Sequence, residues 1–314
     1  MAKKLKIALI FGGTSQEREV SLMSAKTILQ TLDKSKYAVT PVEVSRTNNW
    51  LQQIEKIHKK IDVAFLALHG PGGEDGTIQG VLDLLGVKYT CSGVLASAAA
   101  MDKQITKKLV VSGGMPVLPD VLVNKETFKK HKNQLSKILG MVVVKPNRLG
   151  SSIGVNIVSG NSIAQAVGKA LLQSEDVIIE PFIEGREITV PVWGNQKLQA
   201  LPVVEIVPWD KSQFYDYAAK YTNGGSNHII PAPLSKQQTA HVQELAIMAH
   251  HVLGCRGITR SDFILDQKNN FWFLETNTIP GMTPTSLAPQ SAQAAGFDFR
   301  NFLDKLIQLA LNKE

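Results

Sequence analysis

Three side chains in the C-terminal part of the sequence, Asp262, Glu275 and Asn277, have the types and spacing of ligands for a hard cation. Phe263 and Leu265, then Phe271 and Phe273, recur at every second position on the two sides of a turn-like stretch at 268–270, which predicts a β-hairpin. Because antiparallel strands bring their open ends together, we expect Asp262 to lie beside Glu275 and Asn277. Oxygen ligands placed in this way suit Mg2+. For the hairpin alone, a capping role for Asp262 and a solvated strand end at Glu275 are the alternative.

A loop rich in Gly and Ser at 147–154 follows an apolar strand that ends at Lys145. Its backbone N–H groups can approach phosphate oxygens, and Lys145 can reach the same anion. The loop lacks the Walker A spacing, and a strand rather than a helix is expected after it. We therefore expect a phosphate held between strands, with an ordinary flexible hairpin loop as the alternative.

A break in the strand pattern at 180–187 combines apolar and acidic residues. Phe182 and Ile183 could hold a flat base, while Glu180 or the backbone of its neighbours bonds the edge of the base. Glu187 could bond a ribose. Glutamates on an interdomain surface are the alternative interpretation.

Two further groups of chemical interest follow strands in the N-terminal part. Apolar runs at 5–11, 37–44 and 63–68 alternate with helical patterns, which predicts an open parallel sheet. Ligands of such sheets lie beyond the carboxyl ends of the strands, where Glu17 and His69 are expected. The G-x-G-x-x-G spacing is absent from the first loop, which weakens an interpretation as a dinucleotide-dependent oxidoreductase. For His69 by itself, a histidine in a turn is the alternative.

The remaining patterns predict the elements that position these groups. An irregular stretch at 208–233 carries four aromatic residues within 214–221 and is typical of a lid. Three histidines, His241, His250 and His251, are expected on the face of a helix rather than as ligands. Helices are expected at 78–85, 103–112, 127–139, 162–172, 235–253 and 299–311, and strands at 141–145, 155–158, 177–179, 188–193, 198–203 and 204–207.

The composition is that of an ordinary globular protein. A chain of 314 residues with 44% hydrophobic and 19% charged residues suggests two or three domains. No run approaches the roughly 20 apolar residues of a membrane span, and the N-terminus shows no cleavage pattern. Cys91 and Cys255 lack metal-ligand spacing and are expected to be buried thiols. We expect a cytoplasmic protein without a membrane partner.

The net charge of +7 raises the question of nucleic acid. The lysines form short scattered pairs at 3–4, 59–60, 107–108 and 129–130, without interleaved aromatic residues or a basic tail. We interpret them as solvated helix faces and expect no nucleic-acid partner. A basic balance also suits a small polyanionic substrate, so charge alone does not separate the two.

Seven separate stretches, in order, resemble the D-alanine-D-alanine ligase family of ATP-grasp enzymes. They are GGTSQEREVS at 12–21, HGPGGEDG at 69–76, MDK at 101–103, VKPNRLGSSIGV at 144–155, EPFIEGREITV at 180–190, YDYAAKY at 215–221, and TRSDF at 259–263 through LETNTIPGMTPTSL at 274–287. The resemblance implies a three-domain α/β ATP-grasp architecture and a homodimer. The domains would be an N-terminal open parallel-sheet domain at 1–98, a central subdomain at 99–184, and a C-terminal subdomain at 185–314 with a lid loop at 208–233.

The resemblance also implies ATP and two Mg2+ ions, with Mn2+ as an alternative ion. The metal ligands would be Asp262, Glu275 and Asn277. The residues implied for ATP are Lys103, Lys145, Ser151, Ser152, Glu180, Phe182, Ile183, Glu187, Lys220 and Leu274.

In the implied reaction, a D-alanine carboxylate attacks the γ-phosphate of ATP, and the amine of a second D-alanine displaces phosphate. Glu17 and His69 would bind the first D-alanine, Arg260 and the N–H of Gly281 would stabilise the oxyanion, and Ser286 and Leu287 would bind the second. Tyr221 would close the site with Ser151 and Glu17, as in relatives that form a dipeptide for peptidoglycan. A D-lactate acceptor and a non-catalytic nucleotide or nucleic-acid binder are the alternatives.

Overall fold

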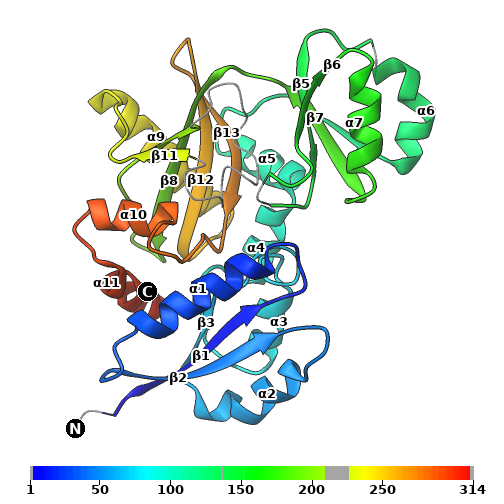
Figure 1. The fold of residues 1–314 in the computed structure, drawn as a ribbon. Helices are drawn as coiled ribbons and strands as arrows, with labels where there is room; N and C mark the ends of the chain where they lie inside the picture. The colour runs from blue at the N-terminus through cyan, green and yellow to red at the C-terminus, as the bar shows by residue number, and fades with distance from the viewer. Residues whose placement is uncertain (1–2, 136, 151, 209–225, 312–314) are drawn as a thin grey trace.

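The structure, a computed structural model, describes residues 3–135, 137–150, 152–208 and 226–311. Within these ranges the chain forms three sheets that follow one another in sequence, each accompanied by helices (Figure 1). None of the helices in the described ranges is long and apolar enough to cross a membrane.

The first sheet is parallel, as the sequence predicts, with the order β2-β1-β3. Its middle strand is buried because helices cover both faces, and Ile7 and Ile10 are fully inaccessible. This part of the chain contains β1 (Leu5–Gly12), α1 (Arg18–Thr31), β2 (Tyr37–Val44), α2 (Trp50–Ile57), η1 (His58–Lys60), β3 (Val63–Leu66), α3 (Thr77–Leu84) and α4 (Val94–Met101).

The second sheet is antiparallel, with the order β4-β7-β5-β6. Its elements are α5 (Lys103–Ser112), β4 (Val121–Asn124), α6 (Lys125–Leu135), β5 (Met141–Pro146), β6 (Asn156–Ser159), α7 (Ser162–Ala170) and β7 (Asp176–Pro181). The helix expected to reach 139 is shorter than predicted. Leu139 is 94% exposed and offers no buried face that would extend α6, and turn hydrogen bonds follow the helix.

The third sheet is also antiparallel, with the order β11-β10-β8-β12-β13 and with β9 on β8. The strand expected at 198–203 is shorter than predicted, because within this stretch only β9 pairs with a neighbouring strand, β8. Part of the irregular stretch expected at 208–233 is also a strand, β11, while 209–225 lies outside the described residues. The elements are β8 (Gly185–Gly194), β9 (Gln199–Ala200), β10 (Val204–Pro208), β11 (Ser226–Ile229), α9 (Lys236–Val252), β12 (Gly257–Asp266), β13 (Phe271–Asn277), α10 (Leu287–Ala294) and α11 (Phe299–Leu311).

The last helix returns to the first sheet. Phe302, Leu306 and Ile307 of α11 are buried in the same hydrophobic core as Leu9 of β1 and Phe65 of β3. The N-terminal and C-terminal parts of the chain therefore share one core (Figure 1).

Helix α9 begins with the predicted capping box, in which the side chains and backbones of Ser235 and Gln238 bond reciprocally. Near its end, His250 is fully buried, and its Nδ1 lies 2.8 Å from Thr259 Oγ1 on β12. Burial lowers the pKa of His250 to about 4, so the ring is neutral at neutral pH.

Protonation of His250 is expected to destabilise the fold in acid. Because the folded pKa of about 4 lies below the ordinary value of 6.5, the stabilisation is complete above pH 6.5 and is lost as pH falls toward 4. The urea midpoint of His250→Gln should therefore fall less steeply over this window than that of the wild type. His251→Gln, a change of the exposed neighbour, is the control. Equal slopes for wild type and His250→Gln would contradict this prediction.

Candidate functional site

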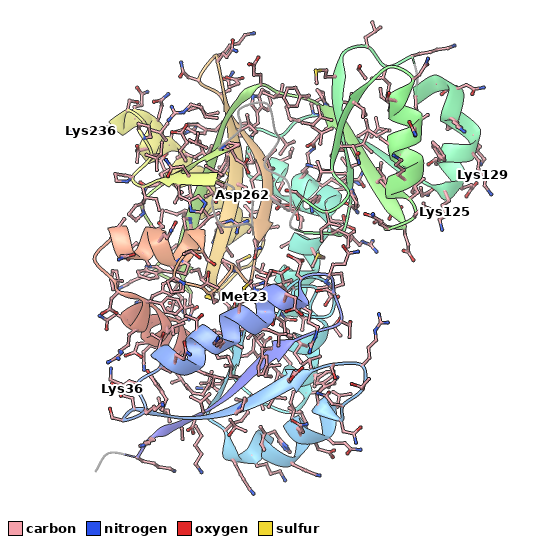
Figure 2. The ribbon with its side chains drawn as sticks, in the orientation of Figure 1. Met23, Lys36, Lys125, Lys129, Lys236 and Asp262 are labelled. Atoms are coloured by element: carbon pink, nitrogen blue, oxygen red, sulfur yellow. The ribbon has the colours of Figure 1, made fainter. Side chains whose placement is uncertain are left out.

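The hairpin that the sequence predicts is present as β12 and β13. Asp262 pairs with Glu275, and Arg260 pairs with Asn277, so the three oxygen-bearing side chains lie at the same end of the hairpin. Asp262 is 6% exposed, and Figure 2 shows it within the C-terminal sheet. The register shifts between Asp262 and Phe263, which fits a local irregularity beside a site.

Two cationic side chains neutralise these carboxylates. Arg260 donates to both oxygens of Asp262, from Nε at 2.9 Å and from Nη2 at 2.8 Å. Lys103 Nζ lies 3.1 Å from Glu275 Oε2. Without such partners, two carboxylates facing each other across strands would repel each other.

The oxygen donors fit Mg2+ in their chemistry. Asp262 and Glu275 both line the same cavity, and hard carboxylate oxygens are the ligands this ion prefers. Asn277 is the third predicted ligand, and its Oδ1 accepts a hydrogen bond of 2.8 Å from the N–H of Ile279.

A cavity between the second and third sheets brings together every predicted ATP-binding residue that the structure describes. These residues are Lys103, Lys145, Ser152, Glu180, Phe182, Ile183, Glu187 and Leu274. Ser151 and Lys220 lie outside the described residues, as does Tyr221. The cavity is also lined by apolar residues that were not predicted to bind ATP: Leu118, Val143, Pro146, Leu149, Ile153, Val155, Pro181 and Ile264. Those on strands could have been found from the alternation that points every second residue to one face.

The glycine-rich loop joins β5 to β6, so it lies between strands as predicted. Ser152 has a φ of 58°, a left-handed conformation that is uncommon for a residue other than glycine. Lys103 Nζ donates to the carbonyl of Leu149 at 2.6 Å. Lys103 thus joins this loop to Glu275 of the hairpin.

One lysine pair was interpreted wrongly from the sequence. Lys108 is exposed, but Lys107 is 3% exposed and contacts Glu180. The spacing of four residues from Lys103 places Lys107 on the same face of α5, and this signal could have identified it. In contrast, the exposed lysines labelled in Figure 2, such as Lys36 and Lys236, lie on separate parts of the surface.

Glu180 lies between two buried lysines. Its Oε1 is 2.5 Å from Lys145 Nζ and its Oε2 is 3.1 Å from Lys107 Nζ. Burial favours the neutral carboxyl, but the two lysines outweigh it and hold the pKa of Glu180 below its ordinary value.

Three loops from different parts of the chain meet at Glu17. Its Oε2 would lie 2.8 Å from a Cβ added to Gly70 and 3.3 Å from one added to Gly150. His69 is buried near it, with Nδ1 3.8 Å from Glu74 Oε1. Burial opposes the charged form of His69, but Glu74 and Glu17 outweigh burial and raise its pKa. Glu74 was not predicted as a site residue, although it lies in the same stretch as His69, HGPGGEDG at 69–76.

The segment after the hairpin leads into α10. Gly281 lies against Ser286, since a Cβ on Gly281 would be 2.8 Å from Ser286 Oγ. Ser286 is the N-cap residue of α10, and Leu287 is the first residue of the helix. The Ser286 hydroxyl accepts a hydrogen bond of 3.2 Å from the N–H of Thr283. The N–H of Gly281 and the start of α10 therefore belong to one compact turn.

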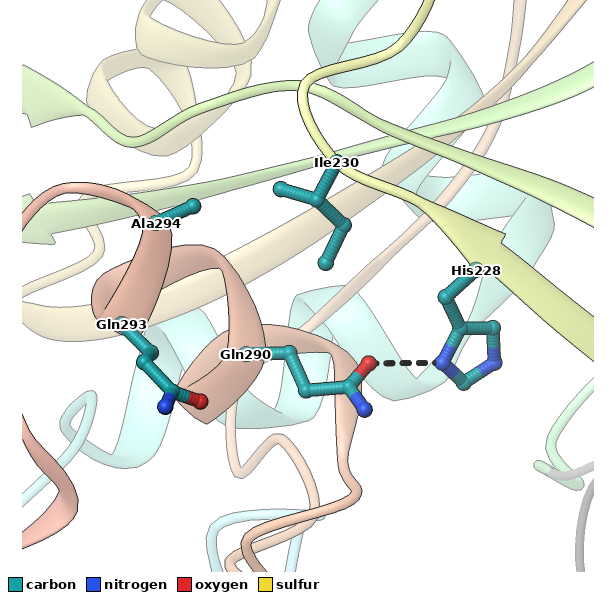
Figure 3. A pocket seen from close by; sticks show the side chains of 5 residues that line it. All are labelled: His228, Ile230, Gln290, Gln293 and Ala294. Carbon is teal, nitrogen blue, oxygen red and sulfur yellow. Dashed lines mark hydrogen bonds between the residues drawn. The ribbon is translucent and has the colours of Figure 1, made fainter.

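A second cavity, of about 320 Å3, lies between β11 and α10 (Figure 3). It is lined by His228, Ile230, Gln290, Gln293 and Ala294, and His228 Nδ1 lies 2.7 Å from Gln290 Oε1. Its lining has amide and apolar groups but neither carboxylates nor lysines. The cavity between the sheets is thus the better match to a phosphorylated ligand.

Comparison with known proteins agrees with this geometry. The family model described as D-ala D-ala ligase C-terminus matches residues 109–308, and the model of the D-ala D-ala ligase N-terminus matches 6–60 and 51–92. The chain is 46% identical over 310 residues to the D-alanine–D-alanine ligase of Syntrophobacter fumaroxidans, covering 98% of each chain. It is also 46% identical to that of Desulfotalea psychrophila, covering 99% of this chain and 97% of the relative.

Solved structures give the same result. The D-alanine–D-alanine ligase of Bacillus anthracis is 33% identical, with a TM-score of 0.84 and coverage of 98% of this chain and 97% of that one. A structure of a D-alanine–D-alanine ligase from the same organism complexed with ATP has a TM-score of 0.83 at 31% identity, with the same coverage. The D-Ala:D-Ser ligase of Enterococcus faecalis is 30% identical, with a TM-score of 0.83 and coverage of 98% and 100%.

The predicted α/β architecture is confirmed by these matches, and the ATP-grasp relationship with it. With the family models and near-full-length relatives in agreement, the chain belongs to the D-alanine–D-alanine ligase family.

Proposed function

We propose that this protein joins two D-alanine molecules with ATP, giving D-alanyl-D-alanine, ADP and phosphate for peptidoglycan precursors. The observation that carries the proposal is the cavity between the two antiparallel sheets, where Lys103 and Lys145 lie with the carboxylates of Asp262 and Glu275. Cations for phosphates and oxygen ligands for a metal are what phosphoryl transfer requires. The identity of the two amino-acid substrates is inferred from the family to which the chain belongs.

The domain organisation proposed for this reaction is an N-terminal domain at 1–98, a central subdomain at 99–184 and a C-terminal subdomain at 185–314. ATP would bind between the last two, with its base near Phe182, Ile183 and Leu274. Both oxygens of Glu180 are ion-paired, which favours the backbone of its neighbours for the edge of the base. Glu187 would bond the ribose.

The phosphates would lie against Lys103, Lys145 and the glycine-rich loop with Ser151 and Ser152. Two Mg2+ ions held by Asp262, Glu275 and Asn277 would neutralise phosphate charge, and Mn2+ could replace them. Lys103 and Arg260 balance the two carboxylates in the structure. Both side chains therefore lie where phosphate and acyl oxygens would need positive charge.

The first D-alanine would bind near Glu17, whose carboxylate takes the ammonium group, with His69 beside it. Holding the ammonium fixes the orientation of the substrate carboxylate toward the γ-phosphate. The attack of this carboxylate on phosphorus releases ADP and gives an acyl phosphate. Ser151 and Tyr221 are proposed to close the site over it, together with Lys220 in the lid loop 208–233.

The second D-alanine would bind with its carboxylate at Ser286 and Leu287, at the N-terminus of α10. Its amine, once deprotonated, attacks the acyl carbon, and phosphate leaves. Arg260 and the N–H of Gly281 would donate hydrogen bonds to the oxygen that becomes negative in this step. No protein nucleophile takes part in this mechanism.

The assembly and location are part of the same proposal. By analogy with the family we propose a homodimer. Cys91 and Cys255 are both buried free thiols, which fits a reducing compartment and supports a cytoplasmic location.

The direct test is phosphate release from ATP and Mg2+ in the presence of D-alanine. Release should require D-alanine and should yield the dipeptide, detected by mass spectrometry. Arg260→Ala should lower kcat by at least about 100-fold, because one oxyanion donor is lost. Arg300→Ala, a change of an exposed arginine on α11, is the control and should retain activity. An absence of D-alanine-dependent release, or a D-lactate or D-serine product formed in preference, would refute the proposal as stated.

Gly281→Ala tests the second amino-acid site. The added Cβ would lie 2.8 Å from Ser286 Oγ, so Ser286 must move, and kcat/KM for D-alanine should fall at least about tenfold. The KM for ATP should change by less than about twofold, because the affected turn lies outside the ATP cavity. Gly80→Ala, where the new Cβ meets ordinary contact at 3.9 Å, is the matched control. Unchanged D-alanine kinetics in Gly281→Ala would contradict the assignment.

A further inference from the structure

Lys107 is a buried lysine without an assigned role in the reaction. Its side chain is 4% exposed, and Nζ lies 2.8 Å from Asp120 Oδ2 and 3.1 Å from Glu180 Oε2. Asp120 is itself 14% exposed and precedes β4. A buried ammonium is costly unless it is paired, and here two carboxylates share it.

The four charges form one neutral row. Asp120 contacts Lys107, Lys107 contacts Glu180, and Glu180 contacts Lys145 at 2.5 Å. Two carboxylates and two ammonium groups sum to zero, so the loss of any single member leaves one uncompensated charge. Removal of either lysine leaves one negative charge in excess.

The row leads from the interior into the cavity. Lys145 and Glu180 line the cavity, whereas Lys107 and Asp120 are not part of its lining. Lys107 therefore lies behind Glu180 as seen from the cavity. The pKa of Glu180 remains below its ordinary value despite burial, because both lysines favour the carboxylate.

We propose that Lys107 is a positioning residue for ATP: by neutralising Glu180 and Asp120 from behind, it leaves the charge of Lys145 available to the phosphates. This inference rests on the proposed function, because it assumes that the cavity binds ATP. Lys107 itself does not contact the nucleotide. Its effect is transmitted through Glu180, which fixes the ammonium group of Lys145.

The physical argument predicts effects of opposite sign. Without Lys107, two carboxylates remain with Lys145 as the single cation of the row, and the one negative charge in excess opposes a polyanion. Without the Asp120 carboxylate, the row carries one extra positive charge instead. Removing both groups restores neutrality, with Glu180 and Lys145 as a simple pair.

The test is titration of each variant with ATP and Mg2+ by calorimetry, without D-alanine. Lys107→Met should raise the Kd on the order of tenfold, the size expected for one added charge near a polyanion. Asp120→Asn should bind ATP as tightly as the wild type or more tightly. The double variant Lys107→Met/Asp120→Asn should recover to within about threefold of wild type. In separate steady-state assays, the KM of all three variants for D-alanine should stay within about twofold of the wild-type value.

A purely structural role for Lys107 would give different ATP affinities in these variants. The inference is overturned if Lys107→Met binds ATP as the wild type does, or if the double variant binds no better than Lys107→Met. If Lys107→Met does not fold, a folded double variant with near-wild-type Kd supports the inference. Weaker ATP binding by Asp120→Asn, by more than about threefold, then overturns it.

The two proposals can fail separately. If wild-type protein binds ATP and forms the dipeptide while Lys107→Met is unaffected, only the role of Lys107 is refuted. If the wild type does not bind ATP, the proposed function fails and the role of Lys107 fails with it. Lys108→Met, a change of the exposed neighbour on α5, should leave ATP affinity unchanged in either case.

Discussion

Two carboxylates face each other across the strands of the C-terminal hairpin, and the rest of the site is arranged around their repulsion. The register places Asp262 opposite Glu275, where like charges are unfavourable unless cations balance them. Arg260 and Lys103 supply that balance from β12 and from the start of α5. Because Lys103 also holds the carbonyl of Leu149, the same charge balance ties the hairpin to the glycine-rich loop.

The features that the sequence predicted best are those with local causes. The buried residues Phe263 and Leu265, then Phe271 and Phe273, recur at every second position, so the hairpin and the pairing of Asp262 with Glu275 could be predicted from spacing. The apolar runs of β1 and β3 likewise indicated a buried parallel sheet. Of the ATP residues implied by family resemblance, those that the structure describes all line one cavity. Their individual roles remain proposals.

The misses arose where tertiary contacts decide the outcome. Lys107 has the sequence surroundings of a solvated lysine, but Glu180, 73 positions away, keeps it buried. Burial of a lysine depends on such a partner, and a single sequence does not contain that information. The stretch at 198–203 has the composition of a strand but pairs regularly only at β9, since pairing requires a neighbouring strand along its whole length.

The shared core of α11 and the first sheet has a consequence for synthesis of the chain. Phe302 and Leu306 complete the packing over β1 and β3, yet they are translated about three hundred residues after the sheet begins. Domains usually fold in order from the N-terminus as the ribosome makes them. Here the first sheet lacks part of its covering until the last helix has been made, so the apolar surface that α11 covers stays open to solvent for most of translation.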